Sequence, residues 1–303
     1  MSAPATLGPR PFPLVPRRRF VGVGFGRRRS SRRGAGDEIA GTRPYLPGDL
    51  IAHIHWAASA RLSEARGTDE FVVREFFAEQ APRVALVHDR RPGMEIHTPP
   101  SPWLDKRGAA EAAGRLIAAS ALAEHGEVVD VDGALRRPVR RARAPLPMES
   151  DGFDGTQEDA LRRGLEALLR QAVLLPSGSF VFVVSDFLLP VPAHLWTRLR
   201  SLRWDVVPVI VQDPVWEQTF PDVGGVVLPL ADPATGRVED VLLSPREARS
   251  RAQANERRLD ELLARFRRLT FDPVLVDTSD PLRVGERFQT WANRRRLLWR
   301  VQA

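Results

Sequence analysis

The chain has 303 residues, of which 43% are hydrophobic and 27% charged, as is ordinary for a globular protein with a sizeable core. It contains no cysteine, so disulfides, thiolate metal ligands and a cysteine nucleophile are excluded. The net charge is +7, but nine arginines and no acidic residue fall within residues 1–36. Subtracting those nine charges leaves the rest of the chain at −2, so the basic character belongs to the N-terminal segment. Lys106 is the only lysine, and base composition of the genome is one explanation for the excess of arginine.

Residues 1–36 form an arm rich in arginine and proline. Five prolines precede residue 20, and this composition predicts an extended, partly flexible segment. Its arginines favour either a solvated arm or a contact with nucleic acid or another anionic surface. Phe12, Phe20 and Phe25 lie among them and would add stacking on bases. The arginines assigned to this anion-binding role are Arg17, Arg18, Arg19, Arg27, Arg28, Arg29, Arg32 and Arg33.

The sequence predicts no membrane-spanning segment and no secretion signal. The apolar runs at residues 180–184 and 206–211 are far shorter than the roughly 18 residues that a spanning helix needs. The N-terminal segment has arginine clusters but no apolar stretch of signal-peptide length. We therefore expect a cytoplasmic protein, which the absence of disulfides also favours.

Residues 37–80 are predicted to be a β-rich segment appended to the main domain. Residues 45–49 read as a turn, because proline restricts one dihedral angle, glycine permits positive φ and aspartate can cap the next segment. Residues 71–77 are rich in β-branched and aromatic side chains and predict a strand. His53 and His55 alternate in a segment read as extended, so both would point to one side.

Residues 81–303 predict one domain of alternating strands and helices. Strands are predicted at residues 84–87, 128–131, 180–184, 206–211 and 274–276, with a hairpin over 226–230 and 238–242 and a hairpin partner at 135–140. Helices are predicted at residues 106–125, 157–174, 190–202, 245–269 and 281–298. Apolar strands separated by helices of this length imply a mostly parallel sheet flanked by helices, an α/β fold.

Two aspartates stand at the ends of predicted strands. Asp89 follows the strand at 84–87, and Asp186 follows the strand at 180–184. In parallel α/β sheets, ligands bind at the carboxyl ends of the strands. These two carboxylates are therefore the best candidates for a functional site.

A set of short motifs resembles the domain of unknown function 58 family. The signature positions are Tyr45, Pro47, Gly48, Asp49, His55, Trp56 and Arg61, and further matching segments are residues 205–214, 232–236 and 291–296. The resemblance covers roughly residues 34–300. It implies a von Willebrand factor type A-like fold for residues 81–303. It also implies a role as accessory or adaptor of a MoxR-type AAA+ ATPase that acts on an unknown client protein. Many family members carry N-terminal membrane helices, which this sequence is not expected to have.

The resemblance also implies a metal-ion-dependent adhesion site in degenerate form. Type A domains bind a divalent ion through Asp-x-Ser-x-Ser, a threonine and a second aspartate. The matching positions here are Asp89, Arg91, Gly93, Thr156 and Asp186. A guanidinium at position 91 would oppose a cation and would pair with both carboxylates. The alternative is Mg²⁺ or Mn²⁺ held by Asp89, Thr156 and Asp186, with water molecules completing the coordination.

The signature segment departs from the family as well. Leu50, Ala52 and His55 stand where the family usually has aspartate, arginine and aspartate, so the usual polar network is not expected to be intact. A histidine metal site is a further, weaker alternative, with candidates His53, His55, His88 and His97.

The first functional hypothesis is a non-enzymatic interaction module without a cofactor. Ser185 has no placed histidine partner, and the side chains of His88 and Asp89 point apart on a strand, so no nucleophile and base are assembled. The second hypothesis is binding of nucleic acid or an anionic surface by the arginine-rich arm. The third is a metal-dependent hydrolase that uses Asp89 and Asp186.

Overall fold

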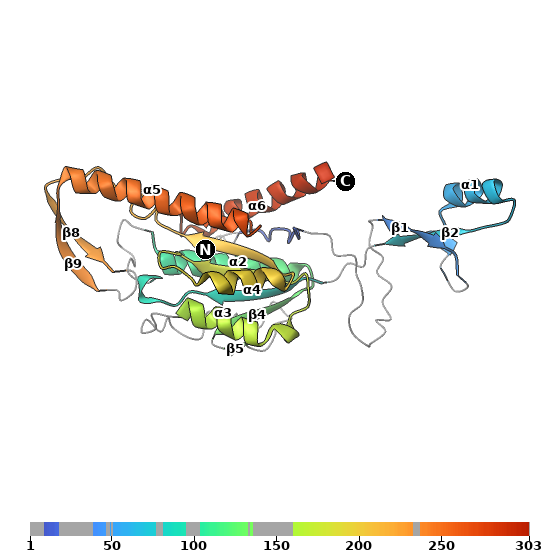
Figure 1. Cartoon of the computed structure of the whole chain (residues 1–303), viewed down its shortest axis with the longest axis horizontal. Coiled ribbons are helices and arrows are strands. Elements are labelled where there is room, and N and C mark those ends of the chain that lie inside the picture. The colour runs from blue at the N-terminus through green and yellow to red at the C-terminus, as the bar shows by residue number, and fades with distance from the viewer. Residues whose placement is uncertain are drawn as a thin grey trace, which may run out of the picture. The chain divides into compact units, whose positions relative to one another are not determined.

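The computed structural model describes residues 9–17, 39–46, 49, 51–76, 81–94, 104–132, 134–135, 160–232 and 237–302. The chain divides into two compact units. One comprises Met1–Arg18 and Ala81–Ala303, and the other comprises Arg19–Gln80. The larger unit contains the central sheet (Figure 1).

The central sheet has six strands in the order β10-β7-β6-β3-β4-β5. The first five run parallel, and the short β5 pairs antiparallel with β4 at one edge. β6 and β7 are buried along their whole length, which explains why their sequences are continuous apolar runs. The strands are β3 (Arg83–His88), β4 (Glu127–Asp132), β5 (Ala134–Leu135), β6 (Phe180–Ser185), β7 (Asp205–Val211) and β10 (Val274–Val276).

Helices cover both faces of this sheet. One face packs against α2 and α6, and the other packs against α3, α4 and the C-terminal half of α5. The helices are α2 (Lys106–Ala123), α3 (Ala160–Arg170), α4 (Ala193–Ser201), α5 (Pro245–Arg268) and α6 (Pro281–Gln302). The predicted α/β class, a mostly parallel sheet flanked by helices, is therefore confirmed.

Element boundaries differ from prediction where proline or a tight turn intervenes. α4 begins at Ala193 rather than residue 190, because Pro192 occupies its N-cap. α3 ends at Arg170, and the 3₁₀ turn Ala172–Leu174 takes up the rest of the predicted helix. The predicted helix start at residues 157–159 lies outside the described residues.

The predicted hairpin is present beside the N-terminal end of α5 (Figure 1). It consists of β8 (Val226–Ala231) paired antiparallel with β9 (Val238–Leu243). Its inner face packs with Phe220, Leu243 and Ala248 in a small separate cluster.

The N-terminal segment is not a free arm throughout, which corrects the prediction for residues 1–36. Phe12 is 2% exposed, and Leu14 and Val15 are also buried in the core beneath α2 and α6. The backbone N–H of Phe12 donates to Ser120 Oγ at 3.0 Å, and that of Leu14 donates to Glu124 Oε1 at 3.0 Å. The burial of the apolar side chains between the prolines outweighs the tendency of a proline-rich segment to remain exposed. Residues 9–17 therefore pack along the domain, and we call them the strap. Among the candidate arginines, Arg17 belongs to this strap, whereas the other seven lie outside the described residues.

The smaller unit contains a two-stranded antiparallel sheet and one helix. β1 (Ile39–Pro44) pairs with β2 (Val72–Phe76), and α1 (Trp56–Arg66) was not predicted. The prediction that His53 and His55 share an extended segment is wrong, because residues 51–53 form a 3₁₀ turn and His55 is the N-cap of α1.

No helix among the described residues combines the length and hydrophobicity that crossing a bilayer demands.

Candidate functional site

The site lies where the order of the parallel strands reverses. From β3 the chain continues to β4 on one side and later returns to β6 on the other side. The carboxyl ends of β3 and β6 therefore flank the switch point, which is the usual ligand position in an open α/β sheet. Asp89 follows β3, and Ser185 and Asp186 stand at the end of β6. All three side chains are buried.

Arg91 joins the two aspartates, as the sequence predicted. Its Nε lies 2.8 Å from both carboxylate oxygens of Asp89, and its Nη2 also donates to Asp89 Oδ2. The same Nη2 donates to Asp186 Oδ1 at 3.0 Å. Ser185 Oγ donates to Asp89 Oδ2 at 2.6 Å. A single guanidinium thus bridges carboxylates from two neighbouring strands.

Lys106 supplies a second buried cation, which sequence reasoning missed. Its side chain is 1% exposed, and Nζ lies 3.0 Å from Asp186 Oδ2 and 2.7 Å from Glu217 Oε1. Glu217 also accepts the backbone N–H of Asp213 at 2.9 Å. The oxygens of Asp89 and Asp186 therefore all accept hydrogen bonds from Arg91 or Lys106.

The pKa values result from burial and from these partners. Burial alone would lower the pKa of Lys106, but the charges of Asp186 and Glu217 outweigh it and raise that pKa. Burial likewise opposes the charged form of Asp186, but Lys106 and Arg91 hold the pKa of this carboxyl below its ordinary range. Burial raises the pKa of Glu217, and the Asp186 charge adds to the rise, with Lys106 compensating only in part. Glu217 is therefore a weaker acid than Asp186.

Backbone contacts fix the rim of the site. Asp213, just after β7, accepts the backbone N–H of Leu104 at 2.6 Å with Oδ2. Its Oδ1 accepts the N–H groups of Val215 and Trp216. Gln212 Nε2 donates to the carbonyl of Asp186 at 2.6 Å. These bonds tie the entry to α2 and the segment after β7 to the same strand ends, so Lys106 and Glu217 are held in place.

We call Asp89, Arg91, Lys106, Asp186 and Glu217 the ionic cluster. The other residues of the predicted metal site are not among its members. Gly93 is buried in the 3₁₀ turn Pro92–Met94, directly after Arg91. Thr156 and His97 lie outside the described residues. Within the described ranges, no three His, Asp or Glu side chains form a group suited to a metal ion.

The signature residues of the smaller unit have structural roles. Asp49 forms two 2.7 Å hydrogen bonds with Arg43 and accepts the backbone N–H of Leu46. His55 Nδ1 accepts the backbone N–H of Ala58 at 3.2 Å and so caps α1. Aspartate, which the resemblance implies for position 55, is also a preferred N-cap, and His55 fills the N-cap position here.

Aromatic rings and a buried serine complete this unit. Tyr45 and Trp56 both pack edge-on against Phe71, with ring centroids at 6.5 and 6.1 Å. Ser59 Oγ accepts the backbone N–H of Val72 at 2.9 Å, which ties α1 to β2. Arg61 is exposed on α1. Pro47 and Gly48 lie outside the described residues.

The fold and the site define an α/β protein with a parallel sheet and a buried ionic cluster at its topological switch point. Residues 41–261 match a family described as "Protein of unknown function DUF58". The chain belongs to this family, which confirms the resemblance seen in its motifs.

Uncharacterized proteins of Mycobacterium tuberculosis and Mycobacterium bovis are each 29% identical over 240 residues, covering 74% of this chain and 70% of their own. Among solved structures, the conserved hypothetical protein BatB from Bacteroides thetaiotaomicron is 15% identical, with a TM-score of 0.37. An aerotolerance-related membrane protein from Bacteroides fragilis is 13% identical, also with a TM-score of 0.37. Each of these two matches covers 70% of this chain and 99% of the other.

Two sequence signals could have pointed to Lys106. It is the only lysine in a chain that otherwise uses arginine. It is also the first residue of α2, where the helix dipole disfavours a cation. A local rule broken at one position often marks a functional or buried ionic site. Glu217, in the segment after β7, carried no comparable signal.

Proposed function

We propose that this protein is a non-enzymatic protein-interaction module with a von Willebrand factor type A-like fold. It acts in the cytoplasm as an accessory or adaptor of a MoxR-type AAA+ ATPase and links that ATPase to a client protein. Family membership supports the proposal, as does the resemblance of the motifs from Tyr45 to Arg296 to the family pattern. The parallel sheet with a polar cluster at its switch point is consistent with the same architecture.

The observation that carries the proposal is the pairing of Arg91 and Lys106 with the strand-end carboxylates. A divalent ion needs oxygen ligands in near-octahedral or similar geometry. Here both oxygens of Asp89 accept from Arg91, and the two oxygens of Asp186 accept from Arg91 and Lys106. An added metal ion would meet two fixed positive charges, so this donor set does not fit one. We infer that side-chain cations replace the ion of the adhesion site.

The surroundings of Ser185 support a structural rather than a catalytic role. Its side chain is fully buried, and its hydroxyl donates to Asp89 and accepts the backbone N–H of Phe187 at 2.9 Å. A nucleophilic serine needs a base in hydrogen-bond reach and access to substrate. In the described part of the chain this hydroxyl is committed to holding the strand ends together.

Co-purification from the native cell tests the proposal. We expect the full chain to recover an AAA+ ATPase. The matched variant carries glutamine at Arg27, Arg28, Arg29, Arg32 and Arg33 and should recover the same ATPase. Substitution is preferable to deletion of residues 1–36, because deletion would also remove Phe12 and its neighbours from the core. Recovery of nucleic acid or ribosomes with the unchanged chain only, and of no ATPase, would contradict the proposal and favour binding by the arginine-rich arm.

A further inference from the structure

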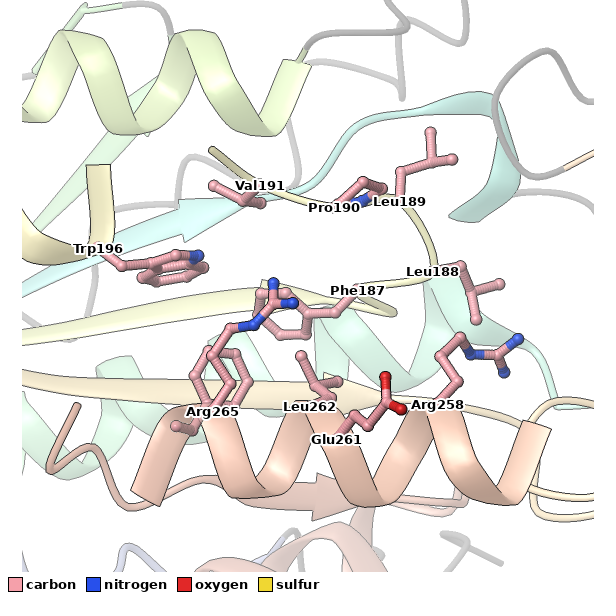
Figure 2. A pocket seen from close by; sticks show the side chains of 11 residues that line it. Phe187, Leu188, Leu189, Pro190, Val191, Trp196, Arg258, Glu261, Leu262 and Arg265 are labelled. Atoms are coloured by element: carbon pink, nitrogen blue, oxygen red, sulfur yellow. The ribbon is translucent and has the colours of Figure 1, made fainter. Parts of the chain in front are cut away.

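A groove lies beside the ionic cluster, between α5 and the segment that follows β6. Its volume is about 200 Å³. The rings of Phe187, Trp196 and Phe266 form its floor, with centroids 5.3 to 6.1 Å apart, and Leu262 extends the apolar surface. Figure 2 shows Phe187, Trp196 and Leu262 in the space between α5 and the segment over residues 188–191. The floor of the groove is thus aromatic and largely apolar.

Phe187 adopts a backbone conformation that its position in the cluster imposes. Its φ is 53°, in the left-handed region, where a bulky residue carries strain of roughly 1–3 kcal/mol. Ser185 Oγ accepts its N–H at 2.9 Å, and Asp186 Oδ1 accepts the N–H of Leu188 at 3.0 Å. Ser185 and Asp186 are themselves bonded to Asp89, Arg91 and Lys106. The ionic cluster therefore holds a strained residue in the wall of the groove, as is common at binding sites.

The rim of the groove is charged and carries arginine N–H donors without acceptors among the described residues. Arg258, Glu261 and Arg265 rise from α5 toward the facing segment (Figure 2), which leaves a net charge of +1. Arg258 donates through its Nη atoms to Asn255 Oδ1 and to the Glu217 carbonyl, while its buried Nε has no acceptor among the described residues. Arg265 is exposed, and within the described ranges its guanidinium takes part in no hydrogen bond or ion pair. A ligand with an acidic group would complement this rim.

The size of the groove decides between classes of ligand. Pockets for small molecules and cofactors are commonly about 300–1,000 Å³, so a volume of this size suits one or two side chains better. Helix-lined apolar grooves commonly receive side-chain anchors of a peptide. A bulky apolar anchor next to a carboxylate matches both the aromatic floor and the arginines.

We propose that this groove binds a short segment of a partner protein in which an apolar anchor residue adjoins an acidic one. The anchor occupies the space over Phe187 and Trp196, and the carboxylate pairs with Arg265. Arg258 adds positive charge at the other end of the rim. This inference rests on the proposed function, because it names the surface through which the interaction module recognises a segment of a partner.

The probe is a fluorescein-labelled peptide, Ser-Asp-Leu-Phe-Glu-Ser, titrated with the full chain and followed by fluorescence anisotropy. We expect Arg265→Glu to weaken binding at least about tenfold, equivalent to about 1.4 kcal/mol, because it removes an attraction and also places a like charge beside the peptide carboxylate. Arg267→Glu is the matched control, because it makes the same charge change in the same last turn of α5 but does not line the groove. Its affinity should stay within about twofold of the unchanged chain.

A gain-of-affinity variant guards against loss through misfolding. Glu261→Gln removes the one acid from the rim and should tighten binding about two- to fivefold. A peptide with asparagine and glutamine in place of its acids should bind more weakly than the probe. No binding by the unchanged chain at roughly 1 mM, or equal losses in Arg265→Glu and Arg267→Glu, would overturn the proposal. So would a dimer, seen by light scattering, that Arg265→Glu abolishes, because a second copy would then occupy the groove.

The two proposals fail in different experiments. If the peptide does not bind but the ATPase is still recovered from cells, the groove proposal is refuted and the adaptor proposal stands. If the peptide binds but no ATPase is recovered, the groove proposal stands and the proposed link to the ATPase is refuted.

Discussion

Replacing Lys106 by methionine is expected to lower the free energy of unfolding by about 3–5 kcal/mol, because it leaves the buried carboxylate of Glu217 without a counter-ion. Methionine keeps the length and apolar stem of lysine, so the loss reports the charge rather than a cavity. Among the described residues, Glu217 loses its only side-chain cation within hydrogen-bond reach, whereas Asp186 keeps Arg91. Urea unfolding of the full chain, followed by circular dichroism, measures the effect.

Two further variants separate the ionic contribution from packing. Arg107→Met, at the next position, removes an arginine whose partner is Glu111 on the surface and should cost at most about 1 kcal/mol. Lys106→Met combined with Glu217→Gln should recover a large part of the loss, because it removes the Glu217 carboxylate together with the cation that pairs with it and leaves the net charge of the cluster unchanged. Additive losses in the double variant would contradict the assigned pairing.

The stability of the cluster depends on pH in a direction set by the pKa shifts. The raised pKa of Lys106 means that its contribution is fully present below the ordinary pKa of lysine and is lost as the pH rises through the raised value. The lowered pKa of Asp186 means that its contribution is present above the ordinary carboxyl pKa and is lost as the pH falls through the lowered value. The pH dependence of Glu217 is opposite to that of Asp186. Its raised pKa means that folding disfavours its ionised form, so its ionisation at higher pH lowers the stability. The penalty of Lys106→Met should therefore shrink as the pH falls, because Glu217, with its raised pKa, takes up a proton before an ordinary glutamate would.

Phe12→Ala is expected to destabilise the larger unit by about 3–5 kcal/mol, the usual range for removing a buried aromatic side chain. Phe12 stacks on Phe288 at 4.8 Å and meets Trp291 edge-on at 5.8 Å, so its loss opens a cavity between the strap and α6. Thermal and urea unfolding measure this change.

Arg10→Ala serves as the control for Phe12→Ala. Arg10 is exposed in the same strap, and its replacement should change stability by no more than about 0.5 kcal/mol. If Phe12→Ala were equally silent, the strap would not be part of the core, and residues 1–36 would be the arm that their composition predicts.

The sheet could be predicted because strands that are buried on both faces have continuous apolar sequences. Phe180–Ser185 and Val274–Val276 are such strands, and their positions followed directly from the sequence. The pairing of Arg91 with Asp89 and Asp186 was also predictable, since strand ends in a parallel sheet share an edge. The strands needed only local pattern, whereas the pairing needed the sheet topology together with the family resemblance that singled out position 91.

The rest depends on contacts that local pattern does not contain. Phe12 sits in a proline-rich stretch, and its burial depends on Phe288 and Trp291, far away in the chain. α1 has no apolar stripe. Ser59 ties it to β2, and Ser63 ties it to the backbone of Glu70, just before that strand. The position of Glu217 depends on Asp213 and Lys106, so only the folded chain reveals it.

Thermal unfolding of the full chain in about 5 mM MgCl₂ or MnCl₂, against EDTA at matched ionic strength, tests the central claim most directly. We predict the same midpoint in all three conditions, because Arg91 and Lys106 already neutralise Asp89 and Asp186. A metal bound with a Kd one hundredth of its concentration would stabilise the native state by about 2.7 kcal/mol and raise the midpoint by several degrees. A rise of that size that saturates with metal concentration would show that the carboxylates hold an ion, and the account of side-chain cations in its place would be wrong.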